Sequence, residues 1–195
     1  MTMSIVIAIA YKNTVIIKSD GRARSTQTGE ILSERCNKTD RISSNVICGF
    51  TGHYNAGLQA LREFKETYCD LLEQASTENL VEALHDITTQ LLTNHPESLK
   101  VAFVVGGFDP DGAPVLYSWK NLGRVSVHRP LSVADISYVF LNPDDYSGDL
   151  RKLLDRYLRI YKMNFHKAMD ACIREVAKNC DSVNSSIFQR SLSRR

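Results

Sequence analysis

The sequence predicts an α+β domain built in layers, with its helices in two separated pairs. Short β-branched stretches are apolar without a break or alternate with polar residues, as strands do, at 4–10, 15–17, 45–50, 101–105, 115–119, 124–128, 137–141 and 185–192. Apolar residues recur every three or four positions, as on amphipathic helices, over 58–72, 80–91, 150–158 and 165–176. Because the helices come in pairs, we expect two sheets that face each other, with one helix pair on each outer face, rather than a βαβ repeat.

The first two strands are expected to form a hairpin. Residues 4–10 and 15–17 are apolar on both faces, and a short polar break separates them, which is typical of a hairpin buried on both sides. The second strand ends in Lys18-Ser19-Asp20-Gly21. Residues 22–37 hold few apolar side chains, so we expect a long loop there.

Capping and turn residues place the later boundaries. Ser76-Thr77 predicts the start of the second helix, and His95-Pro96 predicts its end. Asp109-Pro110-Asp111-Gly112 is typical of a turn between two strands. No internal repeat and no linker-like change of composition interrupts this order, so we expect a single domain over residues 1–195.

The composition excludes several classes of protein. The 24 basic and 22 acidic residues are spread along the whole chain and leave a net charge of +2, which argues against nucleic acid as a partner. The apolar run at 5–10 is too short to span a membrane, and no basic segment precedes it as in a signal peptide. Neither the five cysteines nor the five histidines show zinc-ligand spacing. We expect a cytoplasmic protein with reduced thiols and with neither metal nor cofactor.

Four stretches carry a resemblance to a known family. They are the opening hairpin ending in Ser19-Asp20-Gly21-Arg22-Ala23, the segment Ile47-Cys48-Gly49-Phe50-Thr51-Gly52, the segment Gly112-Ala113-Pro114-Val115-Leu116-Tyr117, and Asp181-Ser182-Val183-Asn184 after the last helix. In this order the chain resembles proteasome β subunits and the peptidase subunit of the bacterial ATP-dependent ring protease. The resemblance covers nearly the whole chain and implies the four-layer αββα sandwich of the N-terminal-nucleophile (Ntn) hydrolases.

The resemblance also implies a catalytic set. In this family a threonine, or sometimes a serine, at the mature N-terminus attacks with its hydroxyl and uses its own α-amine as general base. A buried lysine lowers neighbouring pKa values, and an aspartate orients it. The resemblance assigns these roles to Lys38 and Asp20, and it assigns the backbone donor to the oxyanion to Gly49. It places Asp181 near the nucleophile's amine and Asn184 where the family usually has a serine. Without the resemblance, these are ordinary turn, loop and strand-end residues.

Two residues compete as the nucleophile. Counting back from Asp20 without gaps leads to Ser4, whereas removal of Met1 alone exposes Thr2. Both side chains point to the same face of the strand, about 6–7 Å apart, so only one can reach Lys38. We favour Thr2, because the mechanism needs a free amine and Thr2 obtains one without autolysis.

One stretch departs from the family. Where the family often has a Gly-Ser-Gly-like turn before its third helix, this chain has Phe140-Leu141-Asn142-Pro143. Asn142 can supply a polar group there, but it cannot replace a hydroxyl.

The implied function is a threonine-type or serine-type peptidase that hydrolyses unfolded polypeptides inside a homo-oligomeric ring. The family also suggests an ATP-dependent unfoldase as a partner. Two alternatives stay open: a non-catalytic proteasome-like scaffold subunit, and an Ntn amidohydrolase that acts on a small amide. An intact Met1 on the purified protein favours the scaffold.

Overall fold

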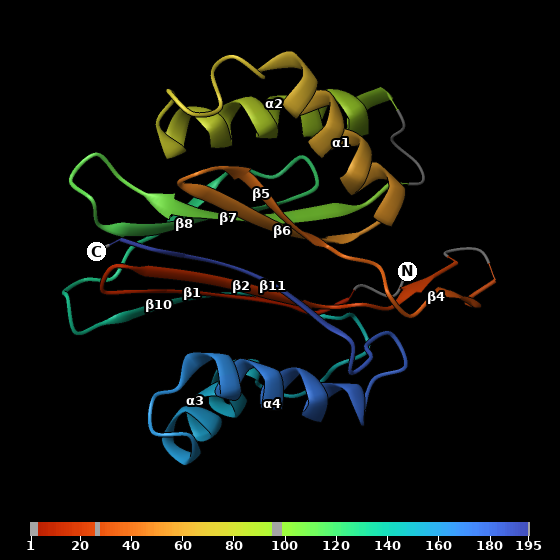
Figure 1. The fold of residues 1–195 in the computed structure, drawn as a ribbon. Helices are drawn as coiled ribbons and strands as arrows, with labels where there is room; N and C mark the ends of the chain where they lie inside the picture. The colour runs from red at the N-terminus through yellow and green to blue at the C-terminus, as the bar shows by residue number, and fades with distance from the viewer. Residues whose placement is uncertain (1–3, 26–27, 95–98, 195) are drawn as a thin grey trace.

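Four layers stack in the order helices, sheet, sheet, helices (Figure 1). The computed structural model describes residues 4–25, 28–94 and 99–194. One helix pair consists of α1 (Tyr54–Thr67) and α2 (Thr77–Asn94), and the other of α3 (Leu150–Ile160) and α4 (Phe165–Ala177). Each pair covers the outer face of one sheet, which confirms the predicted αββα sandwich. None of the described helices is both long and apolar enough to cross a membrane.

The sheet that carries the N-terminal strand is antiparallel, in the order β10-β1-β2-β11. Its strands are β1 (Val6–Tyr11), β2 (Thr14–Asp20), β10 (Ile136–Leu141) and β11 (Ile187–Ser193). β1 pairs with β2 in a register that sets Val6 opposite Ser19, so the predicted hairpin is confirmed. Lys12 turns the hairpin with a φ of 51°.

The other large sheet is also antiparallel, in the order β5-β6-β7-β8-β9. Its strands are β5 (Thr39–Ser43), β6 (Val46–Gly52), β7 (Val101–Phe108), β8 (Pro114–Lys120) and β9 (Ser126–His128). The predicted turn between β7 and β8 is closed by hydrogen bonds between Asp109 and Ala113. Every strand predicted after residue 100 is therefore present.

Two boundaries differ from the prediction. Residues 22–37 are not loop throughout, because β3 (Ala23–Arg24) and β4 (Ile31–Ser33) form a small hairpin that projects from one side of the sandwich (Figure 1). Its strands are held together by backbone pairing, and Leu32 is 69% exposed. Because the strands bury no apolar face, their sequence carries no alternating pattern that would predict them. α1 ends at Thr67 rather than continuing to Leu72, since turns occupy the residues that follow.

α2 begins as predicted. The side-chain hydroxyl of Ser76 accepts a hydrogen bond from the Asn79 amide at 3.1 Å, as an N-cap residue does. The helix ends at Asn94, and the predicted stop at His95-Pro96 lies outside the described residues.

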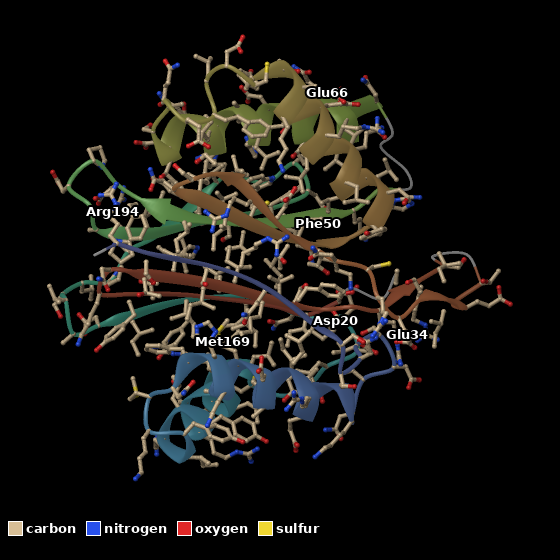
Figure 2. All side chains as sticks on the ribbon, in the orientation of Figure 1. Asp20, Glu34, Phe50, Glu66, Met169 and Arg194 are labelled. Carbon is tan, nitrogen blue, oxygen red and sulfur yellow. The ribbon has the colours of Figure 1, made fainter. Side chains whose placement is uncertain are left out.

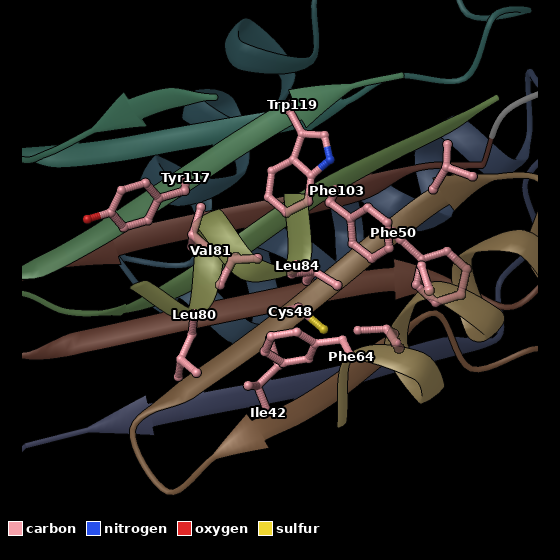
Figure 3. Close-up of a cluster of buried hydrophobic side chains, with 14 of the residues drawn as sticks. Ile42, Cys48, Phe50, Phe64, Leu80, Val81, Leu84, Phe103, Tyr117 and Trp119 are labelled. Carbon is pink, nitrogen blue, oxygen red and sulfur yellow. The ribbon is translucent and has the colours of Figure 1, made fainter. Parts of the chain in front are cut away.

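Alternate residues of β1 belong to different cores. Ile5, Ile7 and Ile9 pack against α3 and α4, whereas Val6 and Ala8 pack between the two sheets. A third core joins the second sheet to α1 and α2 and is rich in stacked rings; Figure 3 shows Phe50, Phe64, Phe103 and Trp119 among its members. These three cores fix the start of β1, the end of β2 and the start of β5 at one edge of the molecule.

Candidate functional site

Ser4, Asp20 and Lys38 meet at the edge where these strands begin or end. Ser4 lies just before β1, Asp20 is the last residue of β2, and Lys38 directly precedes β5. The Nζ of Lys38 donates to the Oγ of Ser4 at 2.6 Å and to the Oδ1 of Asp20 at 3.2 Å. All three side chains are buried, with Ser4 6% and Lys38 2% exposed. The sequence had linked these residues only through the family resemblance.

Asp20 is an acceptor for three donors. Besides Lys38, the backbone amides of Ile5 and Arg22 donate to its carboxylate, at 3.2 and 2.8 Å. Burial raises the pKa of Asp20, and the charge of Lys38 and these amides oppose that rise. Asp20 lies between the sheets close to the projecting hairpin (Figure 2). It therefore fixes Lys38 from behind and ties the start of β1 to the end of β2.

Lys38 brings a cation to the hydroxyl of Ser4. Its Nζ also donates to the backbone carbonyl of Arg22 at 2.5 Å, and the hydroxyl of Ser4 donates to the same carbonyl at 3.1 Å. Burial lowers the pKa of Lys38, and Asp20 opposes that fall. A positive charge 2.6 Å from a hydroxyl oxygen favours its alkoxide form. The arrangement is suited to activating Ser4 for attack on a carbonyl carbon.

A pocket of about 370 Å³ opens beside Ser4 and Lys38. Three further basic residues, Arg22, Arg24 and His53, line it, and no Asp or Glu does. The Nδ1 of His53 accepts a hydrogen bond from the Ala56 amide at 3.3 Å. In its neutral form the ring therefore carries its proton on Nε2. The pocket is the place where a substrate carbonyl could reach Ser4.

Backbone amides alternate in direction along β6. The Phe50 amide donates to the carbonyl of Lys38, on the β5 side, at 3.0 Å, whereas the His53 amide donates to the carbonyl of Lys100, on the β7 side, at 2.7 Å. Successive amides of a strand point to opposite neighbours. Even-numbered amides of β6 therefore face the β5 side, where the pocket lies, and odd-numbered amides face β7.

This alternation bears on the glycine assigned to the oxyanion. Gly49 faces β7 with its amide, does not line the pocket, and packs so closely between the sheets that a Cβ would lie 2.8 Å from Ile17. Gly52 lines the pocket and has a φ of 103°, and the alternation along β6 places its amide on the β5 side. Gly52 thus lines the same pocket as Ser4, whereas Gly49, the glycine expected to supply the oxyanion donor, does not. The sequence segment contains both glycines, but only the pairing of β6 with its neighbours distinguishes them.

Asn184 and Asp181 lie next to the site without contacting the hydroxyl of Ser4. The Oδ1 of Asn184 accepts a hydrogen bond from the Gly21 amide at 2.9 Å, and its Nδ2 donates to the carbonyl of Glu34 at 2.8 Å. Asn184 therefore holds the turn after Asp20. Asp181 is exposed, and its backbone carbonyl, not its carboxylate, accepts a hydrogen bond from Arg22 at 2.7 Å.

No role had been predicted for Ser182 or for Asp145. Ser182 is 3% exposed and lines the pocket beside Ser4. Its amide donates to the carboxylate of Asp145 at 3.1 Å, and its hydroxyl donates to the other carboxylate oxygen. Asn142, considered for the polar role at this turn, is exposed and lines a different hollow. Asp145 follows three residues after Asn142, and only the course of the turn brings it to Ser182.

Thr2, the favoured nucleophile of the sequence analysis, lies outside the described residues. The contact with Lys38 is made by Ser4, the residue that the spacing from Asp20 indicated. Among the described residues, no group of three or more His, Cys, Asp or Glu side chains is placed to hold a metal ion.

Comparison with known proteins is consistent with this geometry. The profile of a family described as "Proteasome subunit" matches residues 2–135. Among solved structures, eukaryotic HslV from Trypanosoma brucei aligns with a TM-score of 0.62 and 12% sequence identity, over 97% of this chain and 99% of that one. At this identity the likeness shows the fold alone. No curated protein matches the chain.

Proposed function

Because the chain belongs to the proteasome subunit family, we propose that it is a serine-type N-terminal-nucleophile peptidase with Ser4 as its nucleophile. One observation carries this proposal: the hydroxyl of Ser4 lies 2.6 Å from the ammonium of Lys38, which Asp20 orients. Two residues of an extended strand span about 6–7 Å, so the hydroxyls of Thr2 and Ser4 are alternatives for this one contact. The spacing from Asp20, which indicates Ser4, therefore outweighs the simpler removal of Met1 that favoured Thr2.

In the proposed mechanism, Met1-Thr2-Met3 is removed and Ser4 carries the free α-amine. With a pKa of about 7.7–8.0, this amine accepts the proton of the hydroxyl as Ser4 attacks the substrate carbonyl. The ammonium of Lys38 stabilises the negative charge on the attacking oxygen, and the amide of Gly52 is the donor for the carbonyl oxygen. The amine then protonates the leaving amine, and water hydrolyses the ester formed on Ser4.

The wider function follows the family. We propose that copies of the chain form a ring in the cytoplasm and hydrolyse unfolded polypeptides in its interior, with an ATP-dependent unfoldase as a further partner. The pocket of about 370 Å³ beside Ser4 supports an extended segment of polypeptide, rather than a folded protein, as the substrate.

Hydrolysis of fluorogenic peptides by three variants tests the proposal. Ser4→Ala should abolish turnover and retain Met1-Thr2-Met3, or Thr2-Met3, when its N-terminus is measured by mass spectrometry. Thr2→Ala should keep wild-type activity, because residue 2 leaves with the leader. Ser185→Ala, at an exposed serine near the same edge, is the matched control and should also be active.

Two outcomes contradict the proposal. If Thr2→Ala is inactive and Ser4→Ala is active, Thr2 is the nucleophile. If the wild-type protein keeps Met1, assembles and hydrolyses no peptide, the chain is a non-catalytic scaffold subunit.

A further inference from the structure

The pocket of about 370 Å³ beside the proposed nucleophile holds more cations than carboxylates. Among the described residues that line it, Arg22, Arg24 and Lys38 carry a positive charge, and none is an Asp or a Glu. Two carboxylates from outside the lining pair with these cations: Asp20 with Lys38 at 3.2 Å, and Glu34 with Arg22 at 3.0 Å. Two carboxylates against three cations leave one positive charge over, at Arg24.

Two of the three cations are fully engaged by the protein itself. The guanidinium of Arg22 donates through Nε to Glu34 at 3.2 Å and through Nη1 to the backbone carbonyl of Asp181 at 2.7 Å. The ammonium of Lys38 donates to the nucleophile's hydroxyl, to its carboxylate partner and to a backbone carbonyl. Neither cation is therefore available to a side chain of the substrate.

Arg24, the third cation, has no carboxylate partner. It lies in β3 and is half-buried, and its Nε donates to the backbone carbonyl of Gly29 at 2.7 Å. It forms no ion pair with any residue that the structure describes. A guanidinium has five N–H donors in a planar fork whose geometry matches a carboxylate, and the bond to Gly29 uses one of them. Arg24 is thus held in place by the hairpin and is suited to bind an anion.

The N-terminus of α1 brings further donors to the same pocket. His53, the N-cap of this helix, and its first two residues, Tyr54 and Asn55, all line the pocket. The first amides of a helix have no acceptor within it, and the helix dipole places about half a positive charge there. α1 has no acidic residue in its first turn to balance this charge. The helix end therefore favours an anion as Arg24 does.

We propose that this pocket binds the carboxylate of a substrate aspartate or glutamate, so that the chain cleaves peptides after acidic residues. The inference rests on the proposed function, because attack by Ser4 brings the side chain next to the cleaved bond into the pocket. A lysine or arginine there would add to the surplus of positive charge. An apolar side chain would remove water from Arg24 without replacing its hydrogen bonds. A carboxylate instead forms charge-assisted hydrogen bonds, which are stronger than those of a neutral amide.

A set of four fluorogenic peptides tests the proposal. They differ only in the residue before the fluorophore, which is glutamate, glutamine, leucine or lysine. Because glutamate and glutamine have the same shape, the ratio of their kcat/KM values measures the effect of charge alone. This ratio should be at least about ten for the wild-type protein, and the lysine peptide should be the poorest substrate.

Variants of Arg24 locate the origin of the preference. Arg24→Gln should lower the ratio at least about threefold, because only the weaker effect of the helix N-terminus remains. Arg24→Glu should make the lysine peptide a better substrate than the glutamate peptide. Arg35→Gln removes an exposed arginine that does not line the pocket, and this control should keep the wild-type ratio.

Two results would overturn the inference, and both are distinct from failure of the peptidase proposal. One is a wild-type protein that hydrolyses the glutamine or leucine peptide as well as the glutamate peptide. The other is a glutamate preference that Arg24→Gln leaves unchanged.

If the wild-type protein hydrolyses none of the peptides, the proposed function fails, and binding then tests the pocket. Fluorescence anisotropy measures the affinity of fluorescein-labelled glutamate and glutamine peptides for the wild type and for Arg24→Gln. Tighter binding of the glutamate peptide that is lost in Arg24→Gln would support a pocket for acidic side chains. Equal affinities for the two peptides would overturn it.

Discussion

At the residue scale, Lys38 controls the electrostatics of the site. Its ammonium is needed in the charged form to stabilise the oxygen of Ser4, while the α-amine is needed neutral. The rate should therefore rise through the amine's pKa of about 7.7–8.0 and fall again as Lys38 loses its proton. Burial lowers the pKa of Lys38, so the alkaline fall should come below the ordinary lysine value of 10.5. A pH–rate profile for peptide hydrolysis measures both limbs.

Lys38→Arg separates this electrostatic role from a structural one. Arginine keeps its charge at every pH of the assay, so the variant, although slower, should lose the alkaline fall and keep the acid limb. An alkaline fall that is unchanged in Lys38→Arg would show that another group titrates there.

The cysteines give a second prediction at this scale. Burial raises the pKa values of Cys48 and Cys172 to about 12. At pH 8 only about one part in ten thousand of each is the reactive thiolate. Cys69, in contrast, is exposed. Iodoacetamide should therefore label Cys69 first in the native protein, and Cys48 and Cys172 only after denaturation. Rapid native labelling of Cys48 would contradict its place in the core.

The residues of the site show how much of it could be predicted from the sequence. Asp20 and Lys38 could be named only because the resemblance to the family assigns their roles to these positions. Gly52 could not be separated from Gly49, because strand pairing decides which amide faces the pocket. Asp145 could not be found either, since its contact with Ser182 joins positions 37 residues apart.

At the element scale, an ion pair joins β2 to α4. The Nζ of Lys18, 2% exposed, donates to Asp170 at 2.5 Å and to the carbonyl of His166 at 3.1 Å. Asp170→Ala leaves a buried ammonium with one acceptor and should lower the free energy of unfolding by about 2 kcal/mol. The side chain of Asp170 is itself 31% exposed, and solvent therefore weakens the ion pair, so we do not expect a larger loss of stability. The double variant Lys18→Met/Asp170→Ala should be more stable than Asp170→Ala in urea unfolding; if it is less stable, the pair is not a buried charge pair.

Close packing of α1 on β6 gives a further prediction. Gly57, in the first turns of α1, lies so close to the ring of Phe50 that a Cβ would overlap it. Gly57→Ala should destabilise the protein by about 1–3 kcal/mol through overpacking, despite a gain of up to about 1 kcal/mol in helix propensity. Asn55→Ala, on the exposed side of the same helix, is the control and should change stability by less than about 0.5 kcal/mol. A Gly57→Ala variant as stable as wild type would mean that the helix can move away from the sheet.

Elements with a buried face could be predicted, and those without one could not. α2, α3, α4 and most strands of the two large sheets bury apolar residues whose periodicity was visible in the sequence. β5 was not predicted, because Ile42 is its only apolar residue. The β3–β4 hairpin exposes its apolar residues, so nothing marked it. Tyr68 and Leu72 continue the apolar spacing of α1 but pack from the turns after it, which made the helix look longer than it is.

At the scale of the whole molecule, the sandwich brings three distant segments to one edge. Ser4 and Asp20 lie at the ends of strands of one sheet, and Lys38 directly precedes a strand of the other. Their contact therefore depends on the packing of one sheet on the other. The order of the elements was enough to predict these layers.

Covalent labelling tests the central claim, that Ser4 is the nucleophile, most directly. A peptide epoxyketone reacts with a residue that has both a hydroxyl and a free α-amine, and a peptide map of the labelled protein identifies that residue. We predict one adduct, on a peptide that begins with Ser4, and none on the Ser4→Ala variant. An adduct on Thr2, or no adduct on an assembled protein, would contradict the account.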